Sequence, residues 1–301
     1  MTDIAIIIIG LNASQYVQEC ITSLRRAEWG KWTYAVIYVD NGSTDDTLSA
    51  LAAHFPEVKV IANPKNLGFC KAANQAAGVA DSRFYFFLND DTLVEGYAVG
   101  TLADLFTTIP NLGVAVSRLL FPDRTEQFSG RRFPSLANGL LGRRSVLTRV
   151  FPEHPAVKRY LYKDELKQDK PFAIEWGSAA AMMFDRVTFE TVGGFAEDYY
   201  YWHEAVVCNR VKQIGRSIYL HPQSIVLHYE GKGSGSRPFV VRKWHIVDFH
   251  RAAYRCYCEH YELGRLSARR WFAALALLTR AASLLAATRI ATWRPKSEVS
   301  R

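Results

Sequence analysis

Short apolar segments alternate with helical segments along the first part of the chain, and this alternation limits the possible fold more than any other feature. Four mainly apolar runs have the length of buried strands: residues 4–9, 34–39, 58–62 and 84–88. Val17, Ile21 and Leu24 lie between the first two runs at spacings of four and three, which is the period of a helix. We expect Leu48 and Leu51 to face inward on a second helix. Repeated units of this kind predict a parallel sheet covered by helices, with right-handed crossovers.

The rest of the chain is less regular. Residues 121–171 are polar, basic and interrupted by prolines, so we expect long loops and short elements there. A helix at 187–192 should end at the glycine pair that follows it. Two short final strands are expected at 218–220 and 225–227, on either side of a His-Pro pair.

The positive charge is concentrated at the C-terminal end. The chain has 37 Lys and Arg against 29 Asp and Glu, which gives a net charge of +8. Residues 232–301 hold fourteen of the basic residues and four of the acidic ones, whereas the preceding part is nearly balanced. A partner attracted by charge would therefore dock on the C-terminal segment. Nucleic acid is not expected, because no nucleic-acid-binding motif accompanies the charge.

The cysteines and the apolar stretches indicate a cytoplasmic protein. The five cysteines are scattered and show no zinc-ligand spacing, which is typical of reduced packing residues. The run at 4–9 has the length of a strand and no basic leader, so no secretory signal is expected. Arg280 interrupts the long apolar stretch at 271–291, and we therefore expect no transmembrane helix.

Two polar clusters follow directly after predicted strands. Asp40 ends the second strand, and Asn89, Asp90 and Asp91 end the fourth. Ligands of open α/β sheets bind at the carboxyl ends of the strands. The first cluster can bind a nucleotide base or sugar, and the hard oxygen ligands of the second suit Mg²⁺ or Mn²⁺ on a diphosphate. Acidic turns or helix caps without a ligand are the alternative in both cases. Together the clusters indicate a sugar-nucleotide enzyme.

Three further features give weaker indications. The loop at 66–69 runs into a helix start, which favours anionic groups. Glu204 stands among aromatic residues, where desolvation raises the pKa of a carboxyl group and suits it to act as a general base. His228 ends a strand and can bind metal or phosphate. A surface glutamate and a structural histidine are the respective alternatives.

The C-terminal segment has two interpretations. On one continuous helix, Arg265, Arg269 and Arg280 would lie within about 60° of one another, with apolar residues on the opposite face. Such a helix can lie on an anionic membrane as a peripheral contact. Alternatively, it is a basic helix packed on the rest of the protein.

Taken in order, these motifs resemble the inverting glycosyltransferases of family 2, which have the GT-A fold. The similarity covers residues 4–236 and rests on the first strand with Asn12, VDNGSTDDT, NLGF, LNDDT, GGFAED and VLHYEGKGS. The chain is similar to bacterial enzymes of surface-polysaccharide assembly, many of them rhamnosyltransferases. We therefore expect an α/β GT-A domain at 1–236, Rossmann-like, with a mostly parallel sheet flanked by helices. Its nucleotide-binding half would be 1–120 and its acceptor half 121–236, with a basic amphipathic helical extension at 237–301.

The motifs and the resemblance together assign a role to each expected site residue. The nucleotide sugar would be bound by polar residues of the strand ends and of the loop and helix after the third strand: Asn12, Asp40, Asn41, Ser43, Asn66, Lys71, Asn74, Asn89 and Asp90. A divalent cation, Mg²⁺ or Mn²⁺, would be held by Asp91 and His228. The acceptor would meet an aromatic group: Trp176, Tyr201, Trp202 and His203. Asn89 departs from the acid that is common at its position in the family.

A more important departure lies at the expected catalytic base. Similar enzymes have a Glu-Asp pair here, followed shortly by another Asp. Aligning on Arg210 sets His203-Glu204 against that pair, whereas aligning on Glu197 sets Glu204-Ala205 against it. Either alignment leaves Glu204 as the acid available, and the second removes the usual base.

The expected function is therefore metal-dependent, inverting transfer from a nucleoside-diphosphate sugar to a hydroxyl of a glycan or lipid-linked glycan. The donor would be dTDP-rhamnose or a UDP-hexose. A catalytically impaired sugar-nucleotide-binding protein of the same fold is the alternative. A nicotinamide-dependent Rossmann enzyme is disfavoured, because no G-x-G-x-x-G turn follows the first strand.

Overall fold

The computed structural model describes residues 2–133, 135, 146–230 and 239–293. It divides into two compact units: Met1–Asp198 with His203–Glu230, and Tyr199–Trp202 with Gly231–Arg301. The proposed boundary after residue 236 lies outside the described residues, and the division of the first domain at residue 120 stays a prediction.

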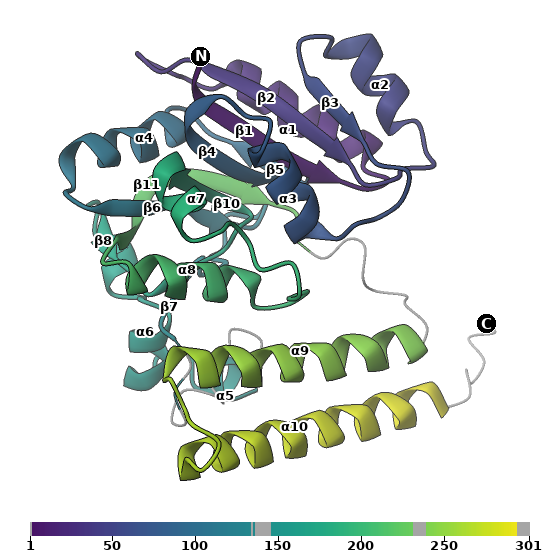
Figure 1. Ribbon diagram of the computed structural model, residues 1–301, viewed down its shortest axis with the longest axis vertical. Helices are drawn as coiled ribbons and strands as arrows, with labels where there is room; N and C mark the ends of the chain where they lie inside the picture. Colours follow the sequence, from purple (N-terminus) through teal and green to yellow (C-terminus); the bar gives the residue numbers. More distant parts are fainter. Residues whose placement is uncertain (1, 134, 136–145, 231–238, 294–301) are drawn as a thin grey trace. The chain divides into compact units, whose positions relative to one another are not determined.

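The first unit is built on one mixed sheet, mostly parallel, as expected (Figure 1). Its strands within the described residues are β1 (Thr2–Gly10), β2 (Tyr34–Asp40), β3 (Lys59–Ala62), β4 (Ser82–Asn89), β5 (Thr92–Val94), β6 (Leu112–Leu120), β8 (Phe172–Ala173), β10 (Ala181–Asp185) and β11 (Ser217–His228). They are ordered β3-β2-β1-β4-β10-β6-β11-β5, with β8 beside β11. β10 runs antiparallel between β4 and β6. A separate small ribbon pairs β7 (Gly130–Arg131) with β9 (Trp176–Gly177).

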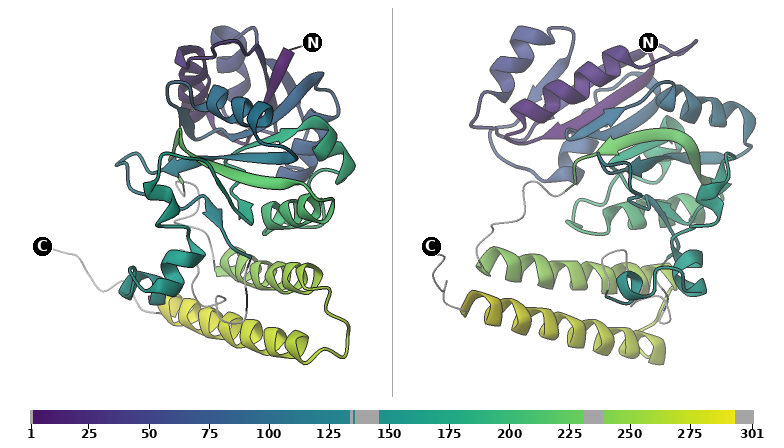
Figure 2. Two further views of the ribbon diagram at one scale, coloured as in Figure 1. Left: turned by 90° about the vertical axis from the view of Figure 1, so that its left-hand side faces the viewer. Right: turned by 180° about the vertical axis from the view of Figure 1, so that it is seen from behind.

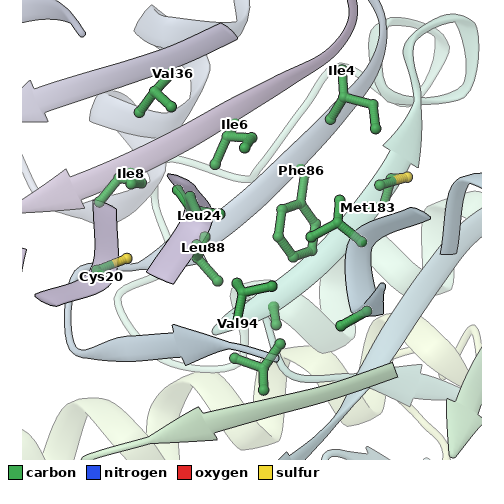
Figure 3. Packing of buried hydrophobic residues seen from close by; sticks show 14 of the residues in the cluster. Ile4, Ile6, Ile8, Cys20, Leu24, Val36, Phe86, Leu88, Val94 and Met183 are labelled. Atoms are coloured by element: carbon green, nitrogen blue, oxygen red, sulfur yellow. The ribbon is translucent and has the colours of Figure 1, made fainter. Parts of the chain in front are cut away.

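Helices cover both faces of this sheet. The described helices of the first unit are α1 (Ser14–Arg26), α2 (Thr47–His54), α3 (Phe69–Ala77), α4 (Ala98–Thr108), α5 (Val146–Val150), α6 (Pro155–Tyr160), the 3₁₀ turn η1 (Glu165–Lys167), α7 (Arg186–Thr191) and α8 (His203–Gln213). The alternation of side chains along a strand divides the core between the two faces. Ile4, Ile6 and Ile8 of β1 point into a cluster that includes residues of α1 and α4. Figure 3 shows part of this cluster, with Cys20 and Leu24 of α1. The opposite face of the sheet is covered by α3, α7 and α8. On this face the rings of Phe87, Phe189 and Phe195 contact one another.

Two local expectations were wrong. Leu48 is exposed, and Thr47 takes the buried position because its hydroxyl accepts a hydrogen bond from the backbone N–H of Ala13. The two final short strands form one strand, β11, which shifts register between His221 and Ile225. Pro222 lies within that irregularity, where a residue without an N–H is tolerated.

The second unit consists of α9 (Phe239–His260), α10 (Ala268–Trp293) and residues 199–202. The two helices lie side by side as a hairpin in all views (Figures 1 and 2). The segment at 199–202 is fastened to α9, because the Tyr199 hydroxyl donates to Glu259 Oε1 at 2.7 Å and the Tyr201 hydroxyl lies 2.7 Å from His245 Nδ1.

The C-terminal segment differs from expectation in two ways. Arg265 precedes the start of α10, so the three arginines expected on one helix are not on one helix. Despite Arg280, an 18-residue window within residues 268–289 of α10 has a mean hydropathy of 1.5, and 11% of that window is buried. By length and composition alone, this helix is therefore able to span a membrane.

Candidate functional site

Parallel pairing brings the predicted polar positions to one edge of the sheet. Gly10 at the end of β1 pairs with Asp40 at the end of β2, and Ile9 pairs with Asn89 at the end of β4. The three strand ends are thus immediate neighbours, because parallel strands in register end together. This is the edge at which open α/β sheets bind ligands.

The two carboxylate oxygens of Asp40 have different surroundings. Oδ2 accepts the backbone N–H groups of Gly42 at 3.1 Å and Ser43 at 3.0 Å. Oδ1 is buried and has no hydrogen-bond partner among the described residues. A buried acceptor without a partner is costly in a folded protein unless a ligand supplies the donor. Asp40 can therefore accept an N–H group of a nucleotide base.

Asn12, Asn41 and Ser43 lie in the loops beside Asp40, and each makes hydrogen bonds within the protein. Asn12 Oδ1 accepts the Thr44 N–H at 2.8 Å, and the backbone N–H of Asn12 donates to Ser43 Oγ at 2.8 Å. The buried Asn41 side chain donates from Nδ2 to the Gly68 carbonyl at 3.4 Å. These contacts hold the loops beside Asp40 in place, and the expected contacts of these residues to a nucleotide stay predictions.

The residues expected after β3 are less closely grouped. Asn66 Oδ1 accepts the Gly68 N–H at 2.8 Å, which shapes the turn into α3, and Lys71 is exposed on the first turn of that helix. Asn74 pairs with the backbone of Phe195 on both sides, accepting from its N–H and donating to its carbonyl at 2.9 Å each. Asn74 therefore ties α3 to the segment after α7, and its expected contact to the nucleotide sugar stays a prediction.

Three side chains converge at the end of β4. His228 Nε2 lies 3.2 Å from Asp91 Oδ1 and 3.3 Å from Asn89 Nδ2. The Tyr229 N–H donates to the Asp91 carbonyl at 2.9 Å, which holds the end of β11 against this turn. Asp90 points elsewhere, since a Cβ atom on Gly10 would lie 2.7 Å from its Oδ2. Burial, and then the charge of Asp91, raises the pKa of Asp90 to about 7.

These residues fit a divalent cation that is shared with a substrate. A carboxylate oxygen and an imidazole nitrogen 3.2 Å apart can both reach one ion. No group of three or more His, Cys, Asp or Glu with metal-binding geometry occurs in the described residues. A site with two protein ligands suits Mg²⁺ or Mn²⁺ that takes its remaining ligands from phosphate and water.

Gln127 completes this cluster and was not identified from the sequence. Its side chain is buried, donates from Nε2 to the His228 carbonyl at 2.6 Å, and places Oε1 2.9 Å from His228 Nδ1. Gln127 lies in the irregular region after β6. No spacing or motif indicates its position, because the contact joins residues 101 positions apart.

The expected base stands at the start of α8. Glu204 lies in the first helical turn, and its Oε2 is 3.6 Å from His203 Nε2. The His203 ring packs 4.9 Å from that of Phe69 at the start of α3. Burial, with the charge of Glu204 as the next cause, raises the pKa of the Cys70 thiol to about 12. Glu204 therefore lies beside α3, next to the loop that Asn41 holds at the end of β2.

The expected acceptor aromatics belong to different parts of the structure. Trp176 is buried in β9, and its indole N–H donates to the Arg132 carbonyl at 2.9 Å, so its ring is not available on the surface. Tyr201 and Trp202 belong to the second unit, where Trp202 packs 5.6 Å from the ring of Phe249. His203 shares the first turn of α8 with Glu204, and the acceptor-binding roles of all four residues stay predictions.

Comparison with known proteins identifies the family. The model described as Glycosyl transferase family 2 matches residues 5–188. N-acetylglucosaminyl-diphospho-decaprenol L-rhamnosyltransferases of two Mycobacterium tuberculosis strains are 26% identical over 268 residues, which is 84% of this chain and 84% of each relative. An uncharacterised glycosyltransferase of Haemophilus influenzae is 28% identical over 95 residues, which is 31% of this chain and 29% of that protein.

Solved structures show the same fold. The mannosyltransferase PcManGT of Pyrobaculum calidifontis, in complex with GDP-Man and Mn²⁺, has a TM-score of 0.59 at 18% identity and covers 98% of this chain and 84% of its own. GalNAc-T7 with UDP, GalNAc and Mn²⁺ has a TM-score of 0.59 at 16% identity, covering 90% of this chain and 54% of its own. The family model spans more than half of the 301 residues. The chain therefore belongs to glycosyl transferase family 2 and is a glycosyltransferase with the GT-A fold.

Proposed function

We propose that this glycosyltransferase transfers a sugar, with inversion at the anomeric carbon, from a nucleoside-diphosphate sugar to a hydroxyl of a glycan or lipid-linked glycan. The observation that carries the proposal is the edge of the sheet where Asp40 ends β2 and the Asp91–His228 pair lies beyond the end of β4, on either side of β1. Asp40 Oδ1 has no partner there among the described residues. An N–H acceptor and a cation-binding pair on one edge match the two ends of a nucleoside diphosphate. The mycobacterial relatives are named L-rhamnosyltransferases, so dTDP-rhamnose, one of the two donors expected from the sequence, is the first donor to test.

The protein groups act at the two ends of the donor. Asp40 Oδ1 accepts from the base, and Gly68 lets the backbone at the start of α3 lie close to the donor. Asp91 and His228 would hold Mg²⁺ or Mn²⁺, which supplies positive charge to the leaving diphosphate. The structures with Mn²⁺ bound support divalent-cation use in this fold.

Glu204 is the proposed general base. It removes the proton of the acceptor hydroxyl as that oxygen bonds to the anomeric carbon, and the bond from this carbon to the diphosphate oxygen breaks on the opposite face. The helix start beside Glu204 is lined by Ala205 and Val206, both buried and without acid–base function. A protein that binds the donor without transfer is the second candidate, because one alignment with the family places the usual base at Ala205.

Nucleotide release by the purified chain separates these two candidates. dTDP-, UDP- and GDP-sugars are incubated with Mn²⁺, with Mg²⁺ or with EDTA, and with lipid-linked acceptors. Release from one donor, abolished by EDTA and by Glu204→Gln, is the expected result. The impaired protein would be identified by donor binding without nucleotide release in the presence of any acceptor, together with nucleotide release that is gained in Ala205→Asp. Absence of binding to every donor would refute both candidates.

We also propose that the hairpin docks on an anionic membrane at the cytoplasmic face, where a lipid-linked acceptor is found. The side of α10 that does not face α9 exposes large apolar side chains, each 64–68% exposed: Trp271, Phe272, Leu275 and Leu278. On the same side, Thr279 donates to the Leu275 carbonyl and Ser283 to the Thr279 carbonyl, each at 2.9 Å. These hydroxyls therefore need no water, as in a helix that contacts lipid.

The charge of the hairpin and the packing of α10 against α9 favour docking on the membrane surface over a membrane-spanning α10. Residues 263–293 contain five arginines and no acid, which complements anionic headgroups. A span would place Arg280, near the middle of α10, in the bilayer centre at a cost of about 2.5–3.5 kcal/mol. It would also carry α9, which contains Asp248, Arg251 and Arg255, into the bilayer.

Co-sedimentation with vesicles tests this surface. The chain should sediment with phosphatidylcholine–phosphatidylglycerol vesicles and much less with phosphatidylcholine alone, and the doubly substituted Trp271→Ser, Phe272→Ser should lose most of this binding. Val187→Ser, which changes an exposed apolar residue of the first unit, is the matched control. Equal binding by the double variant would refute the proposal. A dimer that depends on Trp271 in sedimentation velocity would instead indicate an interface between two copies.

A further inference from the structure

The pairing of His228 with Gln127 determines more than the position of the imidazole ring. Gln127 is 1% exposed and its amide contacts the same histidine twice. Its Nε2 lies 2.6 Å from the His228 carbonyl oxygen, and its Oε1 lies 2.9 Å from His228 Nδ1. The side chain and backbone of one residue are therefore both held by one buried amide.

The chemistry of these groups fixes which nitrogen carries hydrogen. A backbone carbonyl can only accept, so the amide NH₂ of Gln127 must face it, and the amide oxygen must face the ring. That oxygen also only accepts, and His228 Nδ1 must therefore be the donor. In a neutral imidazole one nitrogen bears hydrogen and the other a lone pair. The lone pair of His228 thus resides on Nε2.

The surroundings of Nε2 agree with a lone pair that awaits a cation. Asn89 Nδ2 lies 3.3 Å away and can donate to it. Asp91 Oδ1 lies 3.2 Å away, however, and a lone pair beside a carboxylate oxygen is unfavourable without positive charge between or on them. A divalent ion bound by both atoms relieves this contact.

We propose that Gln127 is a positioning residue that holds His228 in the Nδ1–H tautomer, so that Nε2 and Asp91 Oδ1 together face a divalent cation. This inference rests on the proposed cation site and adds the residue that prepares it. Groups that orient a metal-binding histidine typically change metal affinity 10- to 100-fold when they are removed. We expect an effect of that size on cation binding.

The tautomer can be measured without metal or catalysis. Protein labelled with ¹⁵N-histidine is examined by long-range ¹H–¹⁵N correlation at a pH above the titration of free histidine, and His228→Gln identifies the signal. We expect a protonated Nδ1 and an unprotonated Nε2 in the metal-free chain. The reverse pattern would overturn the proposal. In Gln127→Leu, which removes both hydrogen bonds, we expect the preference for Nδ1–H to be lost.

Cation binding supplies the second readout. Mn²⁺ is titrated by calorimetry in the presence of dTDP or UDP into the wild type, Gln127→Leu, Gln127→Glu and Gln168→Leu. The affinity of Gln127→Leu should fall about 10- to 100-fold. Gln127→Glu keeps an acceptor for Nδ1–H but loses the N–H that donates to the His228 carbonyl, so its affinity should fall, although less than that of Gln127→Leu. Gln168 is exposed and serves as the matched control.

These measurements distinguish the possible failures. Thermal unfolding of each variant shows whether Gln127→Leu loses Mn²⁺ binding because it unfolds. In that case, the Mn²⁺ affinities of Gln127→Glu and the wild type are compared to test the positioning role. Equal Mn²⁺ affinity of folded Gln127→Leu and wild type would refute the positioning role. A wild type that shows the expected tautomer but binds no Mn²⁺ would refute the cation site of the proposed function, and with it the purpose assigned to Gln127.

Discussion

Replacing Asp40 with asparagine tests the donor site directly, because the two carboxylate oxygens have different partners. Oδ2 accepts two backbone N–H groups, and the buried Oδ1 has no partner among the described residues. Asparagine can keep its oxygen at the Oδ2 position, so the backbone bonds of Gly42 and Ser43 survive. Its nitrogen, which only donates, then replaces the acceptor that faces the base.

The magnitude follows from the one hydrogen bond that is lost. A hydrogen bond to a charged acceptor contributes about 1.5–3 kcal/mol, and about 1.4 kcal/mol corresponds to a tenfold change in binding. We therefore expect Asp40→Asn to weaken the Kd for dTDP or UDP about 10- to 150-fold. The free energy of unfolding should change by less than about 1 kcal/mol, because no internal hydrogen bond is lost.

Calorimetry with each nucleotide and thermal unfolding of the same samples check both numbers. Asp46→Asn is the matched control, since Asp46 is exposed in the same loop and its side chain makes no capping hydrogen bond. Unchanged nucleotide affinity in Asp40→Asn would refute the assignment of Oδ1 to the base. A loss of several kcal/mol in stability would show that Asp40 has a mainly structural role.

Two further predictions concern stability. Gly194→Ala should lower the free energy of unfolding by about 3 kcal/mol, since φ is +67° and the new Cβ would lie 2.5 Å from Asn74 Oδ1. Gly193 is also at positive φ but has nothing within 4 Å of a new Cβ, so Gly193→Ala should cost only about 1–2 kcal/mol. Equal losses of the two variants in chemical denaturation would contradict the role of Asn74. Burial, and to a lesser extent the charge of Arg280, lowers the pKa of His250 below 6.5, so the folded state disfavours its protonation. Stability from this group is complete above pH 6.5 and is lost as the pH falls through the folded pKa. The melting temperature of the wild type should therefore fall more on acidification than that of His250→Gln. Parallel pH profiles of the two melting temperatures would contradict this.

Much of the fold and part of the site could be predicted because their determinants are local. Apolar runs specify the strands, and β1, β2 and β4 pair in register, so polar residues that directly follow them must meet. Asp40 and Asn89 were found at one edge of the sheet for this reason. The helical spacing of Val17, Ile21 and Leu24 likewise predicted the buried side of α1.

Local residue patterns were enough to predict the family, the order of the elements and the acidic strand ends. Which side chains those ends meet depends instead on how distant segments pack together. Gln127 reaches His228, and Asn74 reaches Phe195, across 101 and 121 positions. Such amide contacts follow no periodicity, because each depends on where two distant loops are placed by the packing of the sheet. The structure also decided that Trp176 is buried, since an indole N–H close to a carbonyl satisfies its hydrogen bond inside the protein.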